Sequence, residues 1–320
     1  MSMDGLQVSL FGRLSVKLGG DDVSGLDAKK SQELFAYLLV YRTGSHSREV
    51  LAELLWGDRQ PAQSRKYLRQ ALWQLQSVLE TASISAGNPL LDVDPEWVRL
   101  NSSAPLWLDV VQVERAYAQA QGVAGSDLTE ECAYALEQAV QLYRGDFLEG
   151  CYQDWCIFER ERLQNIYLAM LDKLTHCCET QRRYEAGLAY GTQALRYDRA
   201  RERTHRRMMR LHYLAGDRTA ALRQFDQLVA TLKSELNVKP SHRTIALWEQ
   251  IRADRLDDIP HSGSGGMTAL PKDASNGGLS PTVNDSLDRI KQLHAMLASI
   301  QRQVRQEIEI IELAVAQRTP

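Results

Sequence analysis

Residues 60–80 hold the side chains whose types and spacing point most clearly to chemistry with another molecule. Basic residues at positions 59, 65, 66 and 69 alternate with glutamines, and no acidic residue follows them before Glu80. Lys and Arg bind phosphate groups or guanine, and Gln pairs with the edge of adenine. The pattern therefore predicts contact with nucleic acid, and an ordinary surface helix is the alternative interpretation.

The same stretch has the apolar period of a helix. Pro61 suits the first helical turn, and leucines at positions 68, 72, 75 and 79 form one narrow stripe. If this stripe packs on the core, the polar side chains face away from it. The residues expected to face DNA are Gln63, Arg65, Lys66, Arg69, Gln70, Trp73, Gln74 and Ser77. For Trp73, packing against the wing or a neighbouring subunit is the alternative.

Short elements on both sides of this helix indicate how it is positioned. Residues 6–18 alternate like antiparallel strands, and residues 29–41 have the pattern of a helix. Ser47 is a suitable cap for a second, short helix that ends at Gly57, and residues 90–100 have the pattern of a hairpin. Strands, three helices and a hairpin, in this order, predict a winged helix-turn-helix.

The hairpin, which would be the wing, carries an unexpected charge. Its tip contains Asp92, Asp94 and Glu96, whereas a wing that enters a DNA groove is expected to be neutral or basic. Arg99 is the wing residue that we expect to reach a phosphate. The acidic tip leaves the contribution of the wing to binding open.

From residue 108 to about residue 256 the sequence is helical throughout. Ala186 and Leu188 recur as Ala220 and Leu222, an offset of 34 residues, which is the period of a tetratricopeptide helical hairpin. An arginine-rich run at 196–210 is either a solvated face of these repeats or a second phosphate-binding surface. Only a short connection separates this region from the hairpin, and we expect Leu106, Trp107 and Leu108 to pack across the join.

Two sets of residues resemble a known family. Leu54-Leu55-Trp56-Gly57-Asp58 and the leucine stripe resemble the OmpR-type winged helix of the SARP class of bacterial transcriptional activators. Residues 142–148 and Trp155 resemble the bacterial transcriptional activator domain (BTAD), which follows the winged helix in that class. The resemblance implies a transcriptional activator that binds double-stranded DNA and contacts RNA polymerase or other subunits through its helical repeats. The alternative is a protein-interaction scaffold whose winged helix does not bind DNA.

The C-terminal residues have a different composition. Residues 257–281 are rich in Gly and Ser and are expected to form a flexible linker. Residues 282–318 have a heptad pattern that predicts a coiled-coil-like helix and a homo-oligomer. The residues of the expected seam are Val283, Ile290, Leu293, Leu297, Ile300, Val304 and Ile311.

The expected fold class is mainly α, with an N-terminal winged helix-turn-helix (small α/β), a tetratricopeptide-like all-α repeat domain and the C-terminal helix. The expected divisions are the DNA-binding domain at 1–105, the BTAD at 106–256, the linker at 257–281 and the helix at 282–318.

Composition and motifs exclude other classes of function. The chain has 320 residues, a net charge of −3 and no stretch typical of a signal peptide or a membrane span, so we expect a cytoplasmic protein without membrane contact. The five cysteines lack metal-ligand spacing and are expected to be reduced thiols. No triad, phosphate loop or metal motif is present, which predicts no enzyme, no catalytic residues, no metal and no cofactor.

Overall fold

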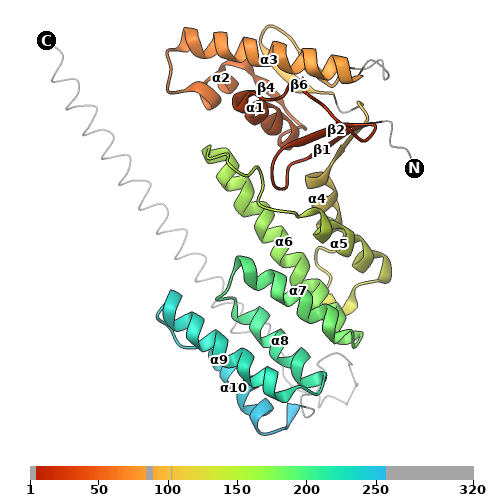
Figure 1. The fold of residues 1–320 in the computed structure, drawn as a ribbon, viewed down its shortest axis with the longest axis vertical. Coiled ribbons are helices and arrows are strands. Elements are labelled where there is room, and N and C mark those ends of the chain that lie inside the picture. Colours follow the sequence, from red (N-terminus) through yellow and green to blue (C-terminus); the bar gives the residue numbers. More distant parts are fainter. Residues whose placement is uncertain (1–4, 84–88, 102, 257–320) are drawn as a thin grey trace, which may run out of the picture. The chain divides into compact units, whose positions relative to one another are not determined.

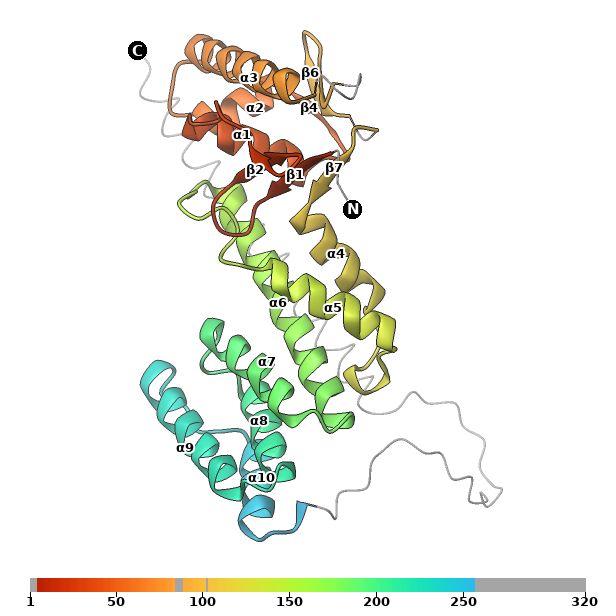
Figure 2. The ribbon, with the colours of Figure 1, turned by 45° about the vertical axis from the view of Figure 1, so that its right-hand side comes forward.

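The computed structural model describes residues 5–83, 89–101 and 103–256, and this part of the chain is mainly helical (Figures 1 and 2). The strands are β1 (Leu6–Ser9), β2 (Ser15–Leu18), β3 (Asp21–Asp22), β4 (Ser45–Ser47), β5 (Leu91–Val93), β6 (Trp97–Leu100) and β7 (Leu106–Leu108). The helices are α1 (Lys29–Val40), α2 (Arg48–Trp56), α3 (Pro61–Ser83), α4 (Asp109–Gln119), α5 (Glu130–Leu142), α6 (Asp154–Thr180), α7 (Tyr184–Tyr197), α8 (Glu202–Leu214), α9 (Arg218–Glu235) and α10 (His242–Arg252), with a 3-10 turn at Gly125–Asp127. The predicted linker at 257–281 and helix at 282–318 lie outside the described residues.

The N-terminal region has the predicted order of strands, three helices and hairpin. The first sheet has the strand order β3-β2-β1-β7, and the second, which contains the wing hairpin, has the order β4-β6-β5. Helices α1, α2 and α3 pack together between these sheets, and their apolar side chains share one core (Figure 1). This arrangement confirms the predicted fold class of the region.

Two strands were not predicted from the sequence. β4 pairs with β6, with His46 opposite Val98, so the wing hairpin is part of a three-stranded sheet with β6 in its centre. β7 pairs in parallel with β1, with Val8 opposite Leu108. Both strands have only three residues, which is too short for a recognisable alternating pattern.

The helical region contains two successive helical hairpins, α6 with α7 and α8 with α9 (Figure 2). Gly187 and Ala221, which are 34 residues apart, occupy equivalent buried positions on α7 and α9. A Cβ on Gly191 would lie 2.7 Å from Cγ of Met208, so this glycine allows α7 and α8 to approach closely. These positions agree with the 34-residue offset, although membership of the tetratricopeptide class stays a prediction.

Contacts cross the predicted boundary between the winged helix and the helical region. The backbone N–H of Leu148 donates to the carbonyl of Leu10 at 2.9 Å, and Phe11 forms a β-bridge with Phe147. The hydroxyl of Tyr41 at the end of α1 donates to Glu159 of α6 at 3.1 Å. The described residues therefore belong to one compact unit with a shared apolar core.

Trp107 contributes less to this join than the sequence suggests. It lies in β7 and is only half-buried, whereas the next residue, Leu108, is fully buried. Side chains alternate between the two faces of a strand, so Leu108 takes the position facing the core. Of the three residues expected to pack across the join, Leu108 is the buried one, and Trp107 lacks the full burial on which a large cost of Trp107→Ala depends.

A membrane span is not present in the described part of the chain, because none of its helices is both long and apolar enough.

Candidate nucleic-acid interface

A short turn fixes α3 against α2. The turn consists of residues 57–60, and the side chain of Ser64 donates to the carbonyl of Trp56 at 2.8 Å. Gly57 is required here, because a Cβ at this position would lie 2.6 Å from the carbonyl oxygen of Glu53. At the start of α2, Ser47 caps the helix by accepting from the N–H of Glu49 at 3.3 Å, as predicted. These contacts build a helix-turn-helix.

The leucine stripe of α3 packs on the core, as predicted. Its members, together with the small residues Ser64 and Ala71, are all buried. The opposite side of the helix is exposed to solvent, and Trp73 there has 70% of its surface accessible. The predicted interface residues that are exposed are Gln63, Arg65, Lys66, Arg69, Gln70, Trp73 and Ser77.

Gln74 differs from the other predicted interface residues on α3. Its side-chain amide donates to the carbonyl of Gly25 at 3.1 Å, and its oxygen accepts from the hydroxyl of Ser31 at 2.9 Å. Both ends of the amide are thus used within the protein. We therefore remove Gln74 from the set of residues expected to read DNA.

Replacing Gln74 by Ala is expected to lower stability and leave DNA preference unchanged. The change removes two hydrogen bonds and leaves the hydroxyl of Ser31 and the carbonyl of Gly25 without this partner, at a cost of about 1–3 kcal/mol. Urea unfolding measures the cost, and selection of bound DNA sequences measures the preference. A changed base preference with unaltered stability would contradict this assignment.

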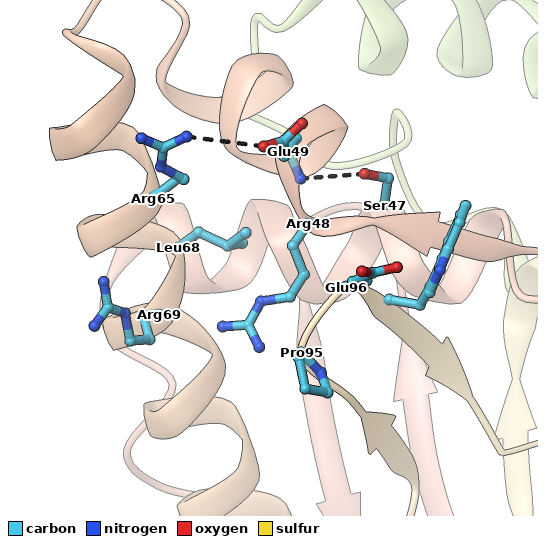
Figure 3. A pocket seen from close by; sticks show the side chains of 9 residues that line it. Ser47, Arg48, Glu49, Arg65, Leu68, Arg69, Pro95 and Glu96 are labelled. Atoms are coloured by element: carbon cyan, nitrogen blue, oxygen red, sulfur yellow. Dashed lines mark hydrogen bonds and ion pairs between the residues drawn. The ribbon is translucent and has the colours of Figure 1, made fainter.

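A cavity of about 510 Å³ lies between α3 and the wing (Figure 3). Three arginines line it: Arg65 and Arg69 from α3, and Arg48 from the first residue of α2. Figure 3 shows Arg48 extending into the space between α3 and Pro95. Its guanidinium donates to the carbonyl of Asp94 at 3.0 Å, which ties the basic group to the wing turn.

Arg48 was not among the residues predicted from the sequence. The signal that could have identified it is its position directly after the capping residue, Ser47, where its side chain lines the same cavity as Arg65 and Arg69 of α3. Arg65, which was predicted, lies 3.8 Å from Glu49. Both of these side chains are largely exposed, so the pair is weak and the arginine remains available for another anion.

The acidic residues of the wing tip have local structural roles. The carboxylate of Asp94 accepts from the N–H groups of Trp97 at 2.7 Å and Glu96 at 2.9 Å. These two backbone hydrogen bonds hold the pKa of Asp94 below its usual value. The carboxylate of Asp94 thus stabilises the wing turn. This structural role explains the presence of an acidic residue at the wing tip without a role in DNA binding.

Arg99, the predicted phosphate contact of the wing, already has an acidic partner. Its guanidinium lies 2.6 Å from the carboxylate of Asp92 on the neighbouring strand, and both side chains are about half exposed. Trp97 is 44% exposed and lines the cavity beside Arg48. An aromatic and a basic side chain are therefore available at the wing, although Arg99 would have to exchange its partner to bind a phosphate.

The cysteines and acidic residues give no sign of a metal centre in the described residues. No group of three or more potential ligands occurs there. All five cysteines are free thiols, and four of them are buried.

Comparisons with known proteins identify one domain and several relatives. Residues 108–252 match the bacterial transcriptional activator domain. The transcriptional regulatory protein MoaR1 of Mycobacterium tuberculosis is 23% identical over 257 residues, covering 79% of this chain and 82% of that protein. The regulatory protein DnrI of Streptomyces peucetius is 28% identical over 271 residues, covering 78% of this chain and 93% of that protein.

A solved structure supports the fold. Mycobacterium tuberculosis EmbR, in complex with a low affinity phosphopeptide, matches with a TM-score of 0.59 and 19% sequence identity. The match covers 78% of this chain and 65% of the EmbR chain, which is less than two thirds of its length. The curated relatives are regulators rather than enzymes, in agreement with the expectation from the sequence. Residues 108–252 are therefore identified as a bacterial transcriptional activator domain, and over most of its length the chain is similar to transcriptional regulators, in agreement with its resemblance to the SARP class.

Proposed function

We propose that this activator binds double-stranded DNA in a sequence-specific manner and reads the major groove with α3. The observation that carries the proposal is the exposed face of α3, where Lys66, Arg69 and Gln70 lie opposite the buried leucines. An α-helix fits the major groove, where Gln can bind adenine and Arg or Lys can bind guanine. A cytoplasmic location is part of this proposal.

The residues around this face divide into two roles. Arg48 and Arg65 line the cavity at the edge of the helix-turn-helix and are placed to hold phosphates, which set register but carry no sequence information. Lys66, Arg69 and Gln70 are candidates for base contacts, and Gln63 and Ser77 extend the polar face toward the two ends of the helix. Trp73 is exposed and offers an apolar surface for a thymine methyl group.

Selection of bound sequences from a random DNA pool with the full chain tests the proposal. We expect enrichment of one motif, with an affinity that falls steeply as salt rises. Two phosphate contacts, those of Arg48 and Arg65, predict a slope of about −2 in a plot of log affinity against log salt, and the slope approaches about −4 if Lys66 and Arg69 also bind phosphates. Scrambled DNA is the control. Absence of enrichment would favour the protein-interaction scaffold as the function.

We further propose that the helical repeat domain, residues 106–256, contacts RNA polymerase. Two exposed aromatic side chains lie near the start of α6: Tyr152, just before the helix, and Phe158, within it, have 77% and 70% of their surface accessible. Neighbouring exposed aromatics are typical of protein interfaces.

Replacing Phe158 by Ala is expected to reduce activated transcription in vitro while DNA affinity stays unchanged. The change removes a large apolar contact without altering the core, so a loss of severalfold in transcript yield is expected if this side chain meets the polymerase. Tyr134 on α5, which is also exposed, provides a matched aromatic control when replaced by Ala. Equal effects of the two variants would contradict the assignment.

Self-association through residues 282–318 is our proposal for the C-terminal region, and it rests on the heptad pattern alone. An apolar stripe along such a helix needs a partner, and an identical helix fits it. We expect the full chain to sediment as an oligomer and a chain ending at Asp258 as a monomer. If both sediment as the same species, the proposed role of the tail is wrong.

A further inference from the structure

A second basic surface lies in the helical repeat domain, in a cavity of about 690 Å³ between α8, α10 and the end of α6. Five arginines line this cavity, and Glu179 is the acidic residue among its lining residues in the described part of the chain. The arginines are Arg203, Arg206, Arg207 and Arg210 from α8 and Arg243 from α10. The first four follow the helical spacing that brings side chains onto one face.

Buried carboxylates hold several of these guanidinium groups in place. Asp172 lies 2.7 Å from Arg203 and 3.3 Å from Arg207, and its side chain is only 9% exposed. Glu179 lies 2.7 Å from Arg210 and 3.5 Å from Arg207. Each carboxylate is shared by two arginines, so it orients them without cancelling their combined charge.

The remaining arginines add to the positive excess. Arg206 donates to the hydroxyl of Thr244 at 2.9 Å and lies 3.8 Å from Glu202, whose carboxylate already accepts from Ser241 and Thr244. Burial, together with the charges of Arg243, Arg203 and Arg207, lowers the pKa of Arg206. Arg243 is exposed and forms no ion pair among residues 5–256 that the structure describes.

The charges in and beside the cavity therefore do not balance. Five guanidinium groups face three carboxylates, those of Asp172, Glu179 and Glu202. A second cavity of about 470 Å³ shares Arg203 and Arg207 with the first and adds Arg201 and Lys173 to its lining. A concentration of positive charge of this kind is unfavourable for the folded protein unless an anion binds it.

The shape of the surface favours a small ligand over a DNA backbone. The phosphates of a duplex lie on a wide convex surface, whereas these arginines converge on a cavity of the size that small ligands occupy. Arg binds phosphoryl oxygens in a bidentate manner, and several oriented guanidinium groups can bind adjacent phosphoryl groups together. Leu247 and Ala246 give the lining an apolar part that suits an organic group attached to the phosphates.

We propose that the cavity between α8 and α10 binds a small ligand with two or more linked phosphoryl groups. The site belongs to the helical repeat domain and not to the proposed DNA interface. An experiment can therefore refute this proposal without refuting the proposed DNA binding, and the reverse is also true. Binding would neutralise the arginine cluster and connect α10 to the hairpin of α8 and α9.

Isothermal titration of the full chain with inorganic triphosphate, at constant ionic strength, tests this proposal. We expect binding that weakens at least tenfold when Arg203 and Arg243 are both replaced by Gln, since charge-assisted hydrogen bonds are lost. Both side chains are exposed and Arg207 still pairs with Asp172, so the double variant should fold, which thermal unfolding verifies. Arg223→Gln on the exposed face of α9 is the matched control and should bind triphosphate as the unmodified chain does.

Titrations with ATP and GTP show whether a nucleoside adds to the affinity. Tighter binding of either than of triphosphate would support a nucleotide, and equal binding would support the phosphate chain alone as the recognised group. Absence of binding by all three compounds, or binding that the double variant leaves intact, would overturn the proposal. Loss of DNA affinity in the double variant without any triphosphate binding would also overturn it and assign the arginines to a DNA backbone.

Discussion

Replacing Lys66, Arg69 and Gln70 together by Ala is expected to weaken binding of the selected DNA by a factor of about a hundred or more. All three side chains are exposed on the face of α3 opposite the buried leucines. Contacts of this kind contribute about 1–3 kcal/mol each, and every 1.4 kcal/mol changes the affinity about tenfold. Even at the lower end the sum exceeds a factor of one hundred. Fluorescence anisotropy with the selected site and with scrambled DNA measures the effect.

Single substitutions distinguish a loss of base contacts, which alters sequence preference, from a loss of phosphate contacts, which weakens binding to all DNA. Gln70→Ala is expected to cost about 1–3 kcal/mol at the preferred site and to relax the preference at one base step. Lys66→Ala is expected to weaken all DNA alike if its ammonium group binds a phosphate, with a salt slope reduced by about one. A triple substitution of Arg223, Gln227 and Lys233 on α9 is the matched control, because it removes the same side-chain types from exposed positions of another helix. Intact binding by the α3 variant, or an equal loss of affinity in the control, would show that α3 is not the helix that recognises the DNA sequence.

The position of α3 could be predicted from the sequence because the information is local. The leucine period, the first-turn proline and the exposed polar face all lie within residues 60–80, and the structure confirms the helix and its buried stripe. Gln74 could not be assigned in the same way, because its partners, Gly25 and Ser31, lie more than 40 residues earlier in the chain. Helical periodicity identifies which side of a helix is polar, but not which polar residues are used inside the protein.

The contacts between the winged helix and the helical region were even harder to predict from the sequence than the role of Gln74. The sequence indicates a short connection with apolar residues 106–108, but several of the contacts across the join are made by backbone groups, such as those of Leu10 and Leu148. Backbone hydrogen bonds leave no trace in residue types. Their partners depend on the parallel pairing of β7 with β1, which brings residues about 100 positions apart into register. Asp109, at the start of α4, stabilises this arrangement with its side chain, which accepts hydrogen bonds from the backbone at the end of β1.

Asp109→Ala is expected to lower the free energy of unfolding by about 2–5 kcal/mol. Its carboxylate is 2% exposed and accepts from the N–H groups of Leu10 at 2.8 Å and Phe11 at 3.0 Å. The change leaves both buried N–H groups without this acceptor, at about 1–3 kcal/mol each. Urea unfolding measures the loss, and Asp127→Ala, in an exposed turn, is the control for removing an acidic residue. A loss below 1 kcal/mol would mean that other groups satisfy these two donors.

Titration of Asp109 makes the free energy of unfolding depend on pH, and the sign of this dependence follows from the direction of its pKa shift. Burial raises the pKa of Asp109 from 3.8 to about 6, and hydrogen bonds from the backbone N–H groups of Phe11, Leu10, Val110 and Asp109 itself only partly oppose this shift. Between pH 4 and pH 6 the folded state therefore binds a proton that the unfolded state releases, so the contribution of Asp109 to stability falls as the pH rises. The slope is at most about 1.4 kcal/mol per pH unit, or up to about 3 kcal/mol across the window.

Comparison with Asp109→Asn isolates this contribution from the other titrating groups. Asn cannot titrate, so the difference in unfolding free energy between the unmodified chain and the variant should shift against the unmodified chain as the pH rises from 4 to 6. The opposite trend would mean that hydrogen bonding outweighs burial and that the pKa of Asp109 lies below its usual value. In either case the measurement reports on the join itself, because the carboxylate connects the end of β1 to the first helix of the activator domain.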